Sequence, residues 1–223
     1  MLEVKLTQSG LPLVSAKSES GEWLTVNGKR AVRVTGHKLF RDAAAIGGET
    51  TTYRLGSESV SITATAGMGI VSAGGEFIPC RTLDRSDPVD HNPNVAIFNL
   101  ASGGVAVRRP LTPPPVKVSI DLWVPLVNAE RVADFARTGP IFVRAGYTGG
   151  RLPAVRLVEP SSVTTTSNPK AVLFRIEGHC AYPGVGDYPG LVAPATVGEV
   201  CRMGITCVGT MADIVHRVNG VTG

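Results

Sequence analysis

The feature that most constrains this fold is a strict alternation of apolar and polar residues in several short stretches. In VKVSIDLWV, residues 116–124, every second residue is Val, Ile or Leu, and Lys, Ser, Asp and Trp lie between them. Successive side chains of a strand point to opposite faces, so this pattern indicates a strand with one face in a core and one in solvent. Residues 29–36, 51–67 and 171–180 alternate in the same way.

Turn-forming residues separate these stretches. The chain has 26 glycines and 16 prolines among 223 residues, which favours many short strands over long helices. We therefore predict a mostly β protein built from antiparallel β-sandwich domains. Residues 37–49, HKLFRDAAAIGGE, end at a double glycine, and we expect a loop there that leads into the next strand.

One internal helix is predicted after the strand at 116–124. Asn128 is a capping residue, Glu130 places an acid in the first turn, and Gly139 is a stop signal. The apolar residues Val132, Phe135 and Ala136 share one helical face, which should pack on a sheet.

The composition divides the chain into four segments. We expect an N-terminal β-sandwich at 1–79, a connecting segment at 80–115, a second β domain with the helix at 116–190, and a tail at 191–223. The connecting segment is rich in Asp, Asn and Pro, and we expect one short strand in it at 95–100.

The tail repeats one short helix-start pattern. Thr196 and Glu199 form T-x-x-E, and Thr210 and Asp213 repeat it with the shorter acid, as in a capping box. Helices this short are not stable alone in water, so we expect them to dock on this protein or on a neighbour. Their interface candidates also include the apolar residues Val200, Met211 and Ile214.

Charge and hydropathy exclude two classes of partner. The net charge is +4, but the basic residues are scattered and the only doublets are at 29–30 and 108–109. We therefore predict no nucleic-acid partner. No stretch approaches 18 consecutive apolar residues, and the first residues lack a signal-peptide pattern, so we expect no membrane insertion.

The sequence contains no pattern that predicts catalysis or a cofactor. Its glycine-rich stretches lack the residues that follow a phosphate-binding loop, its four histidines are dispersed, and the loop at 84–91 does not fit a calcium-binding template. His179 and Cys180 should point to opposite faces of a strand, so they cannot form a catalytic pair. We predict that the protein is not an enzyme and has no cofactor.

Four cysteines allow two interpretations. Cys80, Cys180, Cys201 and Cys207 form no C-x-x-C pair, and the favoured interpretation is buried, reduced thiols. A metal site built from Cys180, Cys201 and Cys207 is the alternative that spacing alone leaves open.

Two tryptophans are further interface candidates. Trp23 lies among polar residues, as a packing anchor or a contact residue, and Trp123 lies on the polar side of its strand. An exposed tryptophan on a sheet suits contact with a partner subunit. The alternative for Trp123 is a second core that covers this face.

The layout resembles the minor tail proteins of long-tailed phages that infect actinobacteria. Residues 30–65, RAVRVTGHKLFRDAAAIGGETTTYRLGSESVSITAT, are similar to their immunoglobulin- or fibronectin-like module. Residues 118–146 look like the strand–helix–strand block that they share with distal-tail proteins, and GTMADIVHRV, residues 209–218, resembles their threonine-led terminal helices.

This resemblance implies a structural virion subunit, assembled in the host cytoplasm into a ring at the tail tip or baseplate. Its partners would be copies of itself and neighbouring tail tube and baseplate proteins. Two alternatives remain: a carbohydrate- or receptor-binding module that uses Trp23 with the loop at 84–91, and a viral capsid β domain.

Overall fold

The computed structural model describes residues 1–84, 96–99, 105–108, 116–144, 155–167, 169–180 and 188–193. Within these ranges the protein is mostly β, with two antiparallel sheets and a single short α-helix. The predicted fold class is confirmed. No helix in the described part of the chain is long and apolar enough to cross a membrane.

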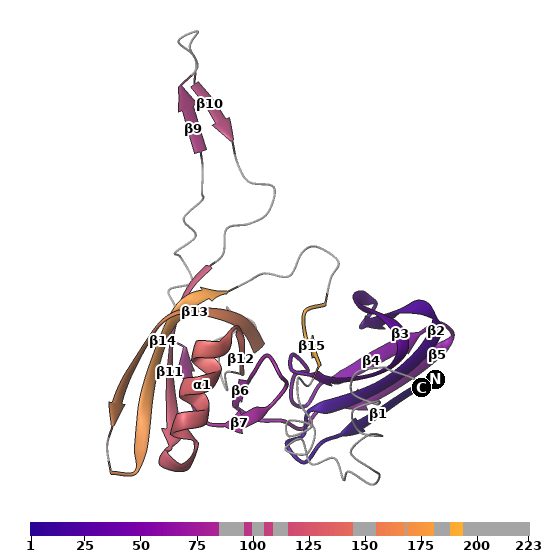
Figure 1. The fold of residues 1–223 in the computed structure, drawn as a ribbon, viewed down its shortest axis with the longest axis horizontal. Helices are drawn as coiled ribbons and strands as arrows, with labels where there is room; N and C mark the ends of the chain where they lie inside the picture. Colours follow the sequence, from indigo (N-terminus) through magenta and orange to yellow (C-terminus); the bar gives the residue numbers. More distant parts are fainter. Residues whose placement is uncertain are drawn as a thin grey trace.

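The first sheet has six strands and lies on one side of the molecule (Figure 1). Their order is β15-β3-β2-β4-β5, with β1 paired to β2. The strands are β1 (Leu2–Leu6), β2 (Pro12–Val26), β3 (Lys29–Asp42), β4 (Thr50–Leu55), β5 (Glu58–Thr63) and β15 (Leu191–Val192). Strand β3 runs on to Asp42, so the expectation of a loop from residue 37 was wrong for its first six residues.

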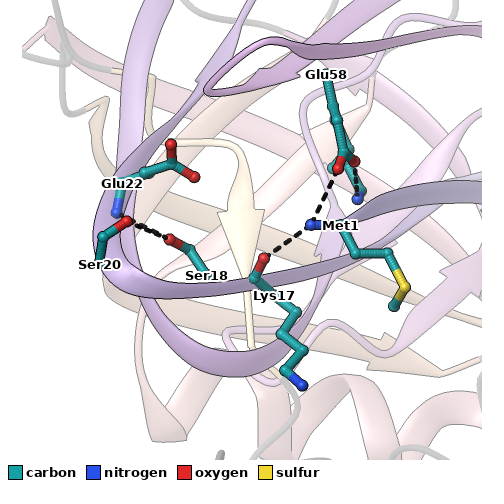
Figure 2. Close-up of polar contacts among 7 residues, drawn as sticks. Met1, Lys17, Ser18, Ser20, Glu22 and Glu58 are labelled. Carbon is teal, nitrogen blue, oxygen red and sulfur yellow. Dashed lines mark hydrogen bonds and ion pairs between the residues drawn. The ribbon is translucent and has the colours of Figure 1, made fainter.

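A bulge in β2 lets this sheet fold over its own core. The pairing of β2 with β3 shifts register between Ser18 and Glu22, and Gly21 in the bulge has φ +73°, a conformation that glycine adopts without strain. The fold brings β1 beside β5. Figure 2 shows the result: the Met1 ammonium group donates to the Lys17 carbonyl at 3.0 Å and lies 3.2 Å from a carboxylate oxygen of Glu58.

The core of the first sheet is therefore enclosed by strands of the same sheet. Its fully buried members include Val14 and Leu24 of β2 and Tyr53 of β4. Residues of β1, β3 and β5 pack in the same cluster. Sheet-on-sheet packing of this kind is the sandwich arrangement that the alternation predicts.

The second sheet has seven strands in the order β7-β6-β12-β13-β14-β11-β8. They are β6 (Gly69–Val71), β7 (Phe77–Pro79), β8 (Arg81–Asp84), β11 (Val116–Pro125), β12 (Ile141–Arg144), β13 (Val155–Ser167) and β14 (Ala171–Cys180). The predicted strand at 95–100 is β9 (Ala96–Asn99), which pairs with β10 (Val105–Arg108) in a separate ribbon.

One helix covers one face of the second sheet (Figure 1). Helix α1 (Ala129–Thr138) follows a short 3₁₀ turn, η1 (Leu126–Asn128), and lies between Asn128 and Gly139 as predicted. The Asn128 side chain makes no capping hydrogen bond, however, and instead accepts one from Arg131 at 3.2 Å. Val132 and Ala136 are buried against the sheet, and Phe135 packs at the edge of the same core. The predicted helix and its apolar face are confirmed.

The two sheets do not follow the predicted segment boundaries. Strands β6 and β7 lie within 1–79 but pair in the second sheet, and β15 lies in the predicted tail but pairs with β3 of the first. Between the sheets, Leu11 and Ala43 pack against Val71 and Phe142. This third apolar cluster joins the two sheets.

Candidate assembly surfaces and the buried polar junction

The outer face of the second sheet, away from α1, carries the candidate Trp123. Its direct neighbours across the ladder are Leu173 of β14 and Arg81 of β8. Trp123 is 43% exposed, and Leu83 on the same face is 48% exposed. No element of the described chain covers this face, so the interpretation as a second core is not the one seen.

An ion pair links two neighbouring strands, β11 and β14, on this face of the sheet. Asp121 lies opposite Arg175 on the neighbouring strand, and the Arg175 Nε donates to Asp121 Oδ1 at 2.9 Å. Asp121 is buried although the sequence pattern placed it on the wet side. The hydrogen bond to Asp121 and the negative charge of Asp121 raise the pKa of Arg175. This ion pair lies on the same face as Trp123 and Leu173, directly beside Leu83 on the neighbouring strand.

Trp23 lies on the outer face of the first sheet in a basic setting. It is 46% exposed, and the Arg30 guanidinium lies 5.5 Å from its ring centroid, within the range of a cation–π contact. Arg33 of β3 pairs directly with Trp23, and Arg54 of β4, the strand on the other side of β2, pairs with Thr25. Trp23 is a surface residue rather than a packing anchor.

A buried polar junction, which the sequence did not reveal, ties the end of β3 to a distant segment. Asp42 is fully buried and accepts hydrogen bonds from the hydroxyls of Tyr53 at 2.6 Å and Tyr188 at 2.8 Å, and from the Ala44 amide at 3.0 Å. The Tyr188 amide donates to the Arg30 carbonyl at 2.6 Å. Tyr188 therefore holds both ends of β3, from a position 146 residues beyond Asp42.

Two buried arginines complete the junction between the sheets. Arg144 of β12 donates to the carbonyl oxygens of Ala43 at 3.0 Å, Ala66 at 3.2 Å and Gly67 at 3.1 Å, all on the first-sheet side. Arg41 donates to the Gly75 carbonyl at 2.7 Å, in the β6–β7 turn. Burial lowers the pKa of Arg41 to about 10. Burial also lowers the pKa of Arg144, although the negative charge of Asp42 acts to raise it.

Burial also raises the pKa of Asp42, although the hydrogen bonds from Tyr53, Tyr188 and Ala44 act in the opposite direction. The folded protein therefore binds a proton at Asp42 more tightly than the unfolded chain does. The contribution of this group to stability is fully present below the unfolded pKa and is lost as the pH rises through the folded pKa.

We expect the stability difference between wild type and Asp42→Asn to reveal this linkage. The free energy of unfolding of the wild type should fall, relative to that of the variant, as the pH rises from about 4 towards neutrality. Urea denaturation across this range measures it. A difference that grows in favour of the wild type with rising pH would show that the hydroxyls and Arg144 depress the pKa instead.

A small cavity lies between the β6–β7 turn and α1. Its volume is about 220 Å³. Glu76, which is buried, forms an ion pair across it with Arg131 of the helix. The two charges compensate each other, and the ion pair links the β6–β7 turn to α1. The lining residues are Ser72, Ala73, Gly74, Glu76, Arg131, Asp134, Phe135 and Thr138.

The described cysteines fit the interpretation as structural thiols. Cys80 and Cys180 are both buried, and burial raises the pKa of the Cys80 thiol to about 12, which keeps it protonated and inert. His179 is exposed and Cys180 buried on consecutive residues of β14, so the predicted opposite faces are confirmed. Within the described ranges, no three His, Cys, Asp or Glu side chains are grouped to hold a metal ion.

The tail candidates lie outside the described residues. These are Thr196, Glu199, Val200, Thr210, Met211, Asp213 and Ile214, together with Cys201 and Cys207. Most of the loop at 84–91, which the sugar-binding alternative requires beside Trp23, also lies outside them. Comparisons of the chain with family models, with curated proteins and with solved structures find no match.

Proposed function

We propose that this chain is a non-enzymatic structural subunit of a virion, a minor or distal tail protein that assembles as a ring at the tail tip or baseplate. The observation that carries the proposal is the exposed pair of Leu83 and Trp123 on one face of a sheet whose other face packs against α1 around a buried core. Large apolar and aromatic side chains on a rigid sheet are typical of contact surfaces between subunits. The proposal that the particle is a phage tail rests on the resemblance of the chain's layout to phage minor tail proteins.

The buried polar junction is a second observation that supports a structural role. Its ionisable groups, Asp42, Arg41 and Arg144, are hydrogen-bonded to backbone carbonyls, amides and tyrosine hydroxyls. They fix the two sheets against each other instead of facing a substrate cavity. A rigid pair of sheets suits a subunit that must hold its neighbours in a fixed geometry.

The test is the position and copy number of this chain in purified, imaged particles. We expect a ring of copies at the tail tip, and we expect Trp123→Ala to stay folded but to be lost from particles. Met68→Ala removes a side chain of similar exposure (42%) elsewhere, and this control should be incorporated normally. A protein that never occurs in virions would exclude the proposal.

A further inference from the structure

Half of the outer edge of β13 pairs with no strand in the described part of the chain. On one side β13 pairs with β14 from Val158 to Ser167, but on its other side β12 pairs only with Val155–Val158. The chain enters β12 at Ile141 directly from α1, which ends at Thr138. Among the described residues, therefore, no strand pairs with the outer edge of residues 162–167.

The chemistry of this free edge favours the addition of another strand. Its sequence is SVTTTS, with no charge, proline or glycine, and every residue is exposed. Exposed edges are normally protected by lysine, proline, a bulge or short length. Here the bulge lies between Pro160 and Ser162, where the free edge begins, and Thr and Val beyond it favour strand conformation.

The edge is complementary to a second copy of itself. Because it is uncharged, antiparallel pairing of two copies places no like charges opposite each other. The residues that would meet are Ser, Thr and Val, and opposed hydroxyl side chains stabilise antiparallel ladders. This chain already contains two such pairs across β4 and β5: Thr50 with Thr63 and Thr52 with Ser61, each at 2.8 Å between oxygens.

The symmetry of an antiparallel ladder fixes where the axis can lie. In an antiparallel pair of identical strands, one residue lies directly opposite its own copy, and the two-fold axis passes midway between the two. The two central residues of the edge are Thr164 and Thr165. With the axis at Thr164, Val163 meets Thr165 and Ser162 meets Thr166; with the axis at Thr165, Thr164 meets Thr166.

We propose that the β13 edges of two copies pair antiparallel across a two-fold axis at Thr164 or Thr165, and so join their seven-stranded sheets into one continuous sheet. Strand addition at an exposed edge is a general mode of recognition in which backbone hydrogen bonds supply the affinity. A two-fold contact is distinct from the head-to-tail contact that closes a ring. This inference therefore stands or falls independently of the proposed role in a virion.

The first test is the mass of the full chain in solution by light scattering or sedimentation. We expect a dimer for the wild type. For Thr164→Lys we expect the affinity of dimerisation to be at least about tenfold weaker, because two added positive charges meet across the interface. Ser57→Lys adds the same charge in the exposed β4–β5 turn and should remain dimeric. Far-UV circular dichroism checks that both variants stay folded.

The second test locates the axis by disulfide cross-linking. A cysteine on the axis faces its own copy at a distance that a disulfide can span. One of Thr164→Cys and Thr165→Cys should therefore form a covalent dimer under mild oxidation, whereas Ser57→Cys should not. A monomeric wild type, or a dimer that survives Thr164→Lys and cross-links at neither position, would overturn the proposal.

Discussion

Replacement of Arg144 with methionine is expected to lower the free energy of unfolding by about 3–5 kcal/mol, the range found when one member of a buried charged network is removed. Three carbonyl oxygens, those of Ala43, Ala66 and Gly67, lose their guanidinium donor. The buried carboxyl of Asp42 also loses the positive charge of Arg144. The interaction between these two groups acts to raise the pKa of Arg144, in opposition to burial. Urea denaturation at neutral pH measures the change.

Arg54→Met is the matched control, because Arg54 is exposed on the first sheet. Its free energy of unfolding should change by no more than about 0.5 kcal/mol, as for most surface substitutions. The double variant Asp42→Asn, Arg144→Met should lose less than the sum of the single variants, since both groups belong to one network. Strict additivity would mean that the two side chains act independently.

Replacement of Phe174 with alanine is expected to cost about 3–5 kcal/mol, the usual range for a buried phenylalanine. Phe174 is 2% exposed and lies opposite Leu122, which is fully buried, in the core beneath α1. The close packing of this core leaves little room for the surrounding side chains to fill the cavity. Thermal or chemical denaturation gives the loss directly.

Leu173→Ala provides the control one residue away on the opposite face. Leu173 lies beside Trp123 on the outer face and is only partly buried, so its replacement should cost about 1 kcal/mol or less. The contrast between these two neighbours tests the period of two that defines β14. Equal losses at both positions would mean that the outer face is as well packed as the core.

Local patterns were sufficient to predict the elements around these two residues. The alternation in 116–124 and 171–180 predicted which residues of β11 and β14 are buried, and the caps predicted α1. Both signals act within a few residues of the chain. Asp121 departs from the pattern because its burial depends on Arg175 from another strand.

The buried junction could not be predicted in the same way. Arg144 and Tyr188 lie far from Asp42 in sequence, and the stretch around Asp42 looked like a loop because small residues and a double glycine follow it. Nothing local indicates that a charged residue will be buried when its partners lie about 100 and 146 positions away. The segment boundaries failed to match the sheets for the same reason, because strand partners are chosen across the whole chain.

By itself, then, the sequence determined the mostly β class, the position of one helix, and the inward side of the principal strands, because side-chain direction and the start and stop signals of a helix are local properties of the chain. Only the tertiary structure decided which strands share a sheet, how Arg144 and Asp42 join the two sheets, and that no described strand pairs with the outer edge of residues 162–167. Those features depend on hydrogen bonds and packing between residues that meet only when the chain has folded.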